Sequence, residues 1–286
     1  MMMVDISNDL ARHKMVELLA RRTGQTLAEN RLWRIDTALK PLLVKYKLNS
    51  IAELSALMDK SIGDALESEI TDALLNNESF FFRDHLLFTY LNATLFEEIR
   101  AARAASKTLS IWLAGCSNGQ EAYSVAMMIA EDKARWDGWT VRIIATDVSE
   151  GAIARAKRGV YSQFEIQRGL PVTKMVRWFD QEGENWVARD ELRQMIDFRQ
   201  QNMLLHTPLG GPFDIIFCRN VLLYFSLPMR REVFSRLKKQ IAPHGYLMLG
   251  AGETVIGQTE DFESSRVHRG FYCPSPEANA PALKFA

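Results

Sequence analysis

From residue 108 onward, short apolar runs alternate with stretches of helical periodicity. The runs 110–116 (SIWLAGC), 141–147 (VRIIATD), 213–220 (FDIIFCRN) and 245–251 (GYLMLGA) are apolar nearly throughout. The segments QEAYSVAMMIAEDKA and LPMRREVFSRLKKQIA, which lie between them, have the spacing of amphipathic helices. Strands of this kind must be covered on both faces, so the alternation predicts an α/β fold with a mostly parallel, doubly wound sheet.

The residues before this region have a different pattern. Residues 1–75 contain helical periodicity and no strand-like run, and the first helix is expected to end at Gly24. Pro41 is expected to break or kink the second helix. We therefore expect an N-terminal all-helical domain over 1–75, followed by a linker and connecting helix over 76–107.

Residues 159–200 interrupt the alternation. Their pattern indicates a short helix and a hairpin, which we interpret as a small antiparallel insertion over about 159–195 before a returning strand, QMIDFRQQN. The segment FESSRVHRGFYCPS predicts two short strands that turn at Arg269-Gly270 and close the sheet as an antiparallel pair. Residues 108–286 would thus form one domain with this insertion and a proline-containing, disordered tail over about 275–286.

Composition excludes several classes of protein. Lys+Arg and Asp+Glu balance at 35 each, which argues against a general nucleic-acid binder. The cysteines, at 116, 218 and 273, and the five histidines have no metal or disulfide spacing, so we expect no metal. The start MMMVDISNDLARHK lacks the apolar run of a signal peptide, and no window is apolar enough to span a bilayer. We expect a cytoplasmic monomer without membrane insertion.

The stretch LAGCSNGQEAYSVA (113–126) has the form of a turn between a strand and a helix that holds a nucleotide. Its glycines, Gly115 and Gly119, lack the third glycine that lets a pyrophosphate approach the helix. Glu121 in the first helical turn would repel a phosphate and attract an ammonium group. The turn therefore favours a nucleoside with an amino-acid end, such as S-adenosylmethionine. Asp147, at the end of the next strand, would accept hydrogen bonds from ribose hydroxyls; the alternative is that both acids merely stabilise helix N-termini.

Several motifs extend this interpretation to a family. They are NNESFFFRD (76–84), GCSNGQEAYSVA (115–126), ATDVSEGAIARAKRGVY (145–161), GPFDIIFCRNVLLYF (211–225) and the weaker LGAGETV (249–255). With them, the chain up to about residue 272 resembles the bacterial chemotaxis-receptor glutamate O-methyltransferases of the CheR type. The resemblance implies S-adenosyl-L-methionine as cofactor, S-adenosyl-L-homocysteine as product and the fold of class I methyltransferases for residues 108–286.

The resemblance also implies roles for individual residues. Arg83 would pair with the methionine carboxylate of the cofactor, Glu121 would hold its amino group and Asp147 its ribose. Tyr224 would stand near the transferred methyl group, so Tyr224 and Arg83 are the expected catalytic residues. The residues expected beside the adenine or along the rest of the cofactor site are Asn77, Ser79, Asn202, Met203, Arg219 and Asn220.

Three of these residues have an alternative role. Arg83 could be a surface arginine, Asn202 could simply cap a turn, and Tyr224 could be an ordinary core residue, because an aromatic residue in an apolar run usually packs.

The implied reaction is methyl transfer to glutamate carboxylates on the cytoplasmic methylation helices of chemoreceptors. A glutamate with a pKa of about 4.3 is already ionised at neutral pH, so it needs placement rather than a general base. The rival classes fit less well: a nicotinamide oxidoreductase would need the missing glycine, and a nucleic-acid amino-methyltransferase would need an Asn/Asp-Pro-Pro-aromatic motif where this chain has RNVLLYF. A cofactor-binding signalling module without turnover remains the alternative.

The sequence departs from the family in places. Gln120 replaces an acid, Ala122 replaces a usual proline, and the basic residues of the second predicted helix are thinned. Some family members grip a receptor tether with a glycine-rich loop in the insertion, but here FDQEGENWVARDELR has only Gly183 and is crowded by Trp186. We therefore expect methylation that does not depend on a tether. The basic residues kept in the second helix region are Arg31, Arg34, Lys40, Lys45 and Lys47.

Overall fold

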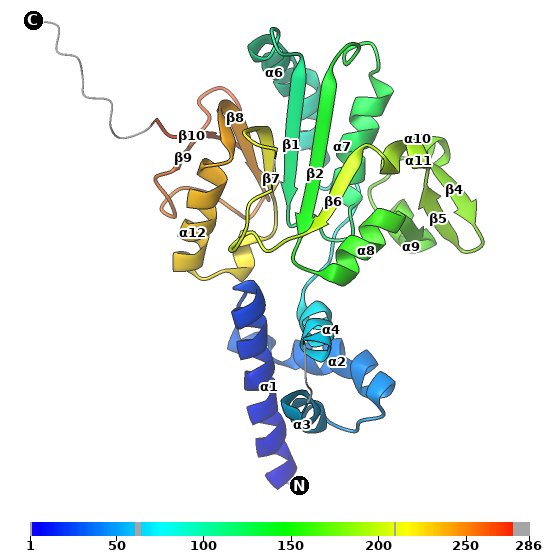
Figure 1. Ribbon diagram of the computed structural model, residues 1–286, viewed down its shortest axis with the longest axis vertical. Helices are drawn as coiled ribbons and strands as arrows, with labels where there is room; N and C mark the ends of the chain where they lie inside the picture. Colours follow the sequence, from blue (N-terminus) through cyan, green and yellow to red (C-terminus); the bar gives the residue numbers. More distant parts are fainter. Residues whose placement is uncertain (1, 61–63, 209, 277–286) are drawn as a thin grey trace, which may run out of the picture.

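The computed structural model describes residues 2–60, 64–208 and 210–276 of the 286-residue chain. A seven-stranded sheet lies at its centre (Figure 1). Its strands are β1 (Thr108–Ala114), β2 (Thr140–Asp147), β6 (Ile196–Gln200), β7 (Phe213–Cys218), β8 (Ile241–Leu249), β9 (Phe262–Ser264) and β10 (Phe271–Pro274). They follow the order β6-β2-β1-β7-β8-β10-β9; the first five are parallel and β10 is antiparallel to both of its neighbours. This confirms the predicted mostly parallel sheet with an antiparallel end.

Both faces of the sheet are buried, as the apolar strands predicted. The two faces are visible along β1, where Ile111 and Leu113 belong to one core cluster while Trp112 and Ala114 belong to another. The first cluster includes residues of α5 to α8, and the second includes those of α12. The helices and turns of this region are α5 (His85–Tyr90), η2 (Leu91–Leu95), α6 (Phe96–Ala102), α7 (Gln120–Glu131), α8 (Glu150–Arg158), η3 (Leu222–Tyr224) and α12 (Leu227–Lys238).

The N-terminal helices pack around a separate core (blue to cyan in Figure 1). They are α1 (Met2–Thr23), η1 (Glu29–Arg31), α2 (Trp33–Tyr46), α3 (Ile51–Lys60) and α4 (Ala65–Leu74). The first helix ends as predicted, since Gly24 has a positive φ of 74° and donates to the carbonyl of Ala20 at 2.8 Å. Pro41 was expected to break or kink the second helix. The predicted break is wrong, because α2 continues through Pro41 to Tyr46.

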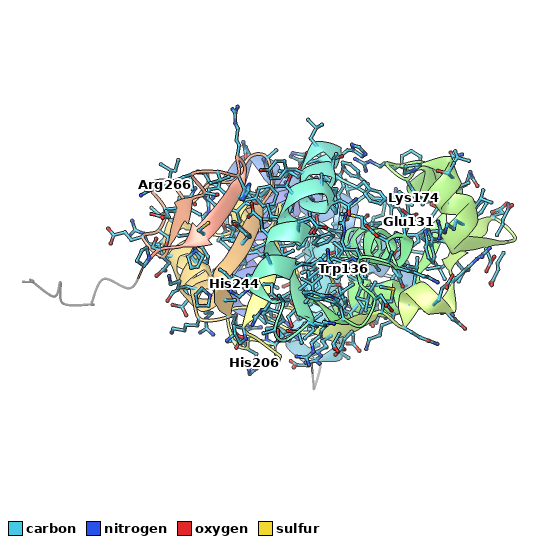
Figure 2. The ribbon with its side chains drawn as sticks, turned by 90° about the horizontal axis from the view of Figure 1, so that it is seen from above. Glu131, Trp136, Lys174, His206, His244 and Arg266 are labelled. Atoms are coloured by element: carbon cyan, nitrogen blue, oxygen red, sulfur yellow. The ribbon has the colours of Figure 1, made fainter. Side chains whose placement is uncertain are left out.

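The segment between α8 and β6 forms a small three-stranded antiparallel sheet of order β3-β5-β4. Its elements are β3 (Val160–Ser162), α9 (Gln163–Gln167), α10 (Val172–Trp178), β4 (Phe179–Glu182), β5 (Asn185–Ala188) and α11 (Asp190–Arg193). The predicted hairpin is present as β4 and β5, whereas β3 and two of the three helices were not expected. Lys174 of α10 pairs with Glu131 of α7 (Figure 2), and Trp178 Nε1 donates to the same carboxylate at 2.9 Å, so these bonds join the small unit to α7.

Two further predictions concern the chain as a whole. The predicted disorder of the tail falls mainly on residues 277–286, which lie outside the described residues. Within the described ranges, no helix is both long and apolar enough to cross a bilayer.

Candidate cofactor site

A cavity lies at the carboxyl ends of β1, β2 and β7, where ligands bind in open α/β sheets. The N-terminal helices and the linker form its other wall, through Thr23, Gln25 and residues 75–79. The structure therefore brings together segments that are far apart in the sequence. Every residue that the sequence assigned to cofactor or catalysis lines this cavity: Asn77, Ser79, Arg83, Glu121, Asp147, Asn202, Met203, Arg219, Asn220 and Tyr224.

The turn after β1 owes its shape to close packing. Gly115 has a φ of 77°, and a Cβ there would lie 2.5 Å from Val221 Cγ2. Gly119 has a φ of 89°, and its Cβ would lie 2.9 Å from that of Ala156. The two glycines thus let the turn pack closely against the segment after β7 and against α8. The linker is tied to this turn because Ser117 Oγ donates to the carbonyl of Asn77 at 2.8 Å.

Asp147 ends β2, and the residue is buried, with 8% of its surface exposed. Its Oδ2 accepts the backbone N–H of Ser117 at 2.8 Å, and its Oδ1 accepts that of Ser149 at 3.0 Å. Burial raises the pKa of Asp147, and these two backbone donors oppose the rise. Each carboxylate oxygen retains a lone pair, so the group is held in place and can still accept hydrogen bonds from ligand hydroxyls.

Glu121 faces Arg219 in the cavity wall. Arg219 is almost completely buried, with a side chain 1% exposed, and its Nη1 donates to Glu121. Its Nη2 donates to the carbonyl of Arg83 at 2.9 Å and also to the carboxylate of Asp84. Burial raises the pKa of Glu121 and the charge of Arg219 opposes the rise. The sequence predicted that Glu121 would hold the amino group of the cofactor. It did not predict that Glu121 would also pair with the buried Arg219.

The donors and acceptors of this wall fit an amino-acid end. Among the residues that the structure describes, Arg219 Nε is buried without a hydrogen-bond partner, and a ligand carboxylate or carbonyl would satisfy it. The guanidinium of Arg83 lies over the ring of Phe80, 5.3 Å from its centroid, and also lines the cavity. The wall thus offers two cations and one buried carboxylate, which match a carboxylate and an ammonium group.

Asn202 and Met203 lie between the sheet and α1. Asn202 Nδ2 donates to the carbonyl of Arg22 at 2.9 Å, and its Oδ1 accepts the N–H of Leu204 at 2.9 Å. Its amide therefore caps a turn, the alternative role considered from the sequence, and joins that turn to the N-terminal helices. Met203 is half-buried and lines the cavity.

Tyr224 is half-buried at the cavity wall, so it is not an ordinary core residue. Its hydroxyl accepts a hydrogen bond of 2.5 Å from Asn76 Nδ2, and its backbone carbonyl accepts the N–H of Thr26 at 2.8 Å. Sequence reasoning missed Asn76 and Asp84, although both lie in the motif NNESFFFRD. It also missed the contribution of Thr23 and Gln25, for which the sequence contains no signal.

A metal has no evident place in this site. Over residues 2–60, 64–208 and 210–276, no group of three or more His, Cys, Asp or Glu side chains is arranged to hold one.

The chain is similar to one protein-family model, to several known proteins and, distantly, to solved structures. The family model described as "CheR methyltransferase, SAM binding domain" matches residues 77–271. The chemotaxis protein methyltransferase of Vibrio parahaemolyticus is 37% identical over 257 residues, which cover 88% of this chain and 92% of that protein. Chemotaxis protein methyltransferase 1 of Pseudomonas aeruginosa is 34% identical over 249 residues, covering 86% and 90%. A solved glycopeptide N-methyltransferase, MtfA with S-adenosylmethionine, aligns over 55% of this chain and 52% of its own at 13% identity and a TM-score of 0.32, a likeness too distant to carry any argument.

Proposed function

Since the chain belongs to the CheR methyltransferase family and is an S-adenosylmethionine-dependent methyltransferase, we propose that its acceptors are glutamate side-chain carboxylates of chemoreceptors. The observation that carries the proposal is the chemistry of the cavity wall. As far as the structure describes it, this wall contains no histidine and no lysine. Its cysteine, Cys116, is buried, and burial raises the pKa of the thiol well above its ordinary value. The carboxylates of the wall already have partners: Glu78 accepts from Arg168, Glu121 accepts from Arg219, and Asp147 accepts backbone N–H groups. We therefore assign none of them as a general base, which suits an acceptor that is already ionised.

The reaction needs placement more than proton transfer. When bound, S-adenosylmethionine would supply a sulfonium methyl group: a carboxylate oxygen would form the O–CH₃ bond as the C–S bond breaks with its electron pair on sulfur, and no proton would move. Arg83, Arg219 and Glu121 would hold the amino-acid end, and Asp147 would hold the ribose. Tyr224 would keep the acceptor in line, because its hydroxyl is fixed by Asn76.

The proposed partner is the set of acidic methylation helices in the cytoplasmic part of a chemoreceptor. Cationic side chains gather beside the linker: Arg168 donates to Glu78 at 2.6 Å, and the charges of Arg83 and Arg34 reinforce that bond in lowering the pKa of Glu78. Arg34 belongs to α2, so this helix lies near the linker residues that line the cavity. An acidic helix would be attracted to this region. A cytoplasmic, monomeric enzyme that does not bind nucleic acid is part of the same proposal.

We also propose that methylation does not depend on a receptor tether. The hairpin from β4 to β5 is closed by two residues only, Gly183 and Glu184, so it has no long loop that could enclose a peptide. Trp186 occupies the middle strand of this small sheet, and its Nε1 donates to Gln163 at 2.7 Å. Micromolar binding of an aromatic-containing receptor tail peptide to the protein would contradict this part of the proposal.

The proposal is tested by incubating the protein with methyl-labelled cofactor and membranes from its own cell. We expect label on bands of chemoreceptor size, and no label on nucleic acid. If the protein binds cofactor with normal affinity but labels no receptor, it acts instead as a cofactor-binding module without turnover, and the proposed activity is wrong.

A further inference from the structure

Glu253 lies in the connection after β8, in the motif LGAGETV, and its carboxylate reaches the segment after β7. Its Oε2 accepts the backbone N–H of Asn220 at 2.6 Å and that of Gly250 at 2.8 Å. Its Oε1 accepts the N–H of Leu222 at 2.8 Å and, more weakly, that of Leu223 at 3.4 Å. One carboxylate thus accepts hydrogen bonds from both the segment after β7 and the end of β8.

These bonds stabilise a segment, residues 219–221, that belongs to no helix or strand. Asn220 has a φ of 59°, in the left-handed region, and the chain there belongs neither to β7 nor to η3. The segment also packs tightly against the end of β8, because a Cβ on Gly250 would lie 2.5 Å from Asn220 Nδ2. Hydrogen bonds to an ionised acceptor are about twice as strong as neutral ones, so Glu253 contributes strongly to this conformation.

We propose that Glu253 is a positioning residue for methyl transfer: its carboxylate fixes residues 219–224 in the conformation that presents Asn220 and Tyr224 to the cavity. This proposal rests on the proposed function, because one of its tests measures kcat for receptor methylation. Glu253 is absent from the residues that line the cavity, so it acts through this segment rather than on a ligand.

Displacement of this segment should affect kcat and cofactor affinity differently, whereas a general loss of structure would lower both. Arg219 is anchored independently by Glu121, Asp84 and the carbonyl of Arg83. Asp147 and Glu121 belong to other segments of the chain. Loss of the Glu253 bonds should therefore displace Tyr224 and lower kcat more than it lowers the affinity for S-adenosyl-L-homocysteine, which loses only the contact assigned to Asn220.

The experiment compares Glu253→Gln and Glu253→Ala with Glu260→Gln, an exposed acid in the same connection. The Gln variant keeps the shape of the side chain but turns an amide N–H₂ toward backbone donors. We expect kcat for receptor methylation to fall at least tenfold in both Glu253 variants, with S-adenosyl-L-homocysteine affinity by calorimetry within about threefold of the parent. Glu260→Gln should match the parent in both measurements.

A second measurement does not require turnover. Amide hydrogen exchange at Asn220 and Leu222 should quicken at least tenfold in Glu253→Gln, while exchange at Ile216 in β7 stays slow. Unchanged exchange and unchanged kcat would overturn the inference, as would loss of cofactor affinity and thermal stability in proportion to kcat. If the parent protein itself shows no turnover, the proposed function fails, and exchange at Asn220 and Leu222 decides whether Glu253 holds the segment.

Discussion

Asn76 donates a hydrogen bond of 2.5 Å to the hydroxyl of Tyr224, although the two residues are 148 positions apart in the chain. The bond joins the start of the linker to the segment after β7. The same linker supplies Arg83 to the cavity and is tied by the carbonyl of Asn77 to Ser117 in the turn after β1. The candidate site is therefore assembled where the N-terminal helices, the linker and the sheet meet.

Removal of the Tyr224 hydroxyl tests its assignment to the methyl group. We expect Tyr224→Phe to lower kcat about tenfold, the effect of losing one hydrogen bond that matters mainly in the transition state. Affinity for S-adenosyl-L-homocysteine should change less than about threefold. The matched control is Tyr46→Phe, which removes a hydroxyl that donates to Glu69 at 3.2 Å in the N-terminal helices and should leave kcat unchanged. A parallel loss of affinity and kcat in Tyr224→Phe would assign the residue to cofactor binding instead.

Asp147→Ala tests the ribose assignment. The variant removes a buried carboxylate that would accept charge-assisted bonds, each worth about 1.5–3 kcal/mol, so cofactor binding should weaken at least tenfold. Calorimetry with S-adenosyl-L-homocysteine measures the change. Asp197→Ala on the neighbouring β6, an exposed acid paired with Arg199, should bind like the parent. Unchanged affinity in Asp147→Ala would remove the argument for a ribose contact.

The raised pKa of Glu121 predicts two pH effects of opposite sign. Without ligand, the folded state binds a proton at Glu121 more readily than the unfolded chain does, so this residue lowers stability at neutral pH. That cost is relieved as the pH falls through the raised pKa. A ligand ammonium favours the ionised carboxylate, so cofactor affinity should fall over the same range, above the ordinary value of 4.5.

Glu121→Gln provides the comparison for both effects. Melting temperature and cofactor affinity are measured between about pH 7.5 and about pH 5 for both proteins. The variant should bind cofactor more weakly at neutral pH and with a flatter pH dependence than the parent. Identical pH profiles would show that Glu121 does not titrate with binding.

Charge reversal on the N-terminal helices tests the proposed docking surface. Arg31 is exposed in η1 and Arg34 is half-buried in α2. Their change to Glu should raise KM for receptor, with kcat and cofactor affinity kept, and added salt should diminish the difference. Lys40→Glu is the control. Lys40 lies six residues beyond Arg34, on another side of α2, and its change to Glu reverses a charge in the same way. If receptor methylation is indifferent to both arginines and to salt, the docking surface lies elsewhere.

The sequence predicted the sheet and the composition of the site better than the contacts inside it. Nearly continuous apolar runs identified the central strands, because burial on both faces of a parallel sheet leaves that pattern. Sequence patterns could not reveal that α2 passes through Pro41, since packing of Ile35 and Leu39 in the helical core compensates for a local preference. The strand β3 escaped notice because three residues are too few to show alternation.

Within the site, the residues that line the cavity were predictable from the sequence, but their mutual hydrogen bonds were not. Glu121 lies in the first helical turn after β1, and Asp147 lies at the end of β2. Both positions can be read from the sequence. The bond that Arg219 donates to Glu121 joins residues 98 positions apart. The bonds that Asn220 and Leu222 donate to Glu253 likewise join two separate segments of the chain. Such contacts depend on how two loops meet in space, which single-sequence patterns do not encode.

The central claim is that the acceptor is a carboxylate, and the stability of the product in base tests it most directly. Receptor-containing membranes are labelled with methyl-tritiated S-adenosylmethionine, the pH is raised and volatile methanol is counted. A methyl ester hydrolyses in mild base, so the account predicts that the label leaves the protein as methanol. Label that stays on the protein through base would show an N-methyl product and contradict the carboxylate acceptor.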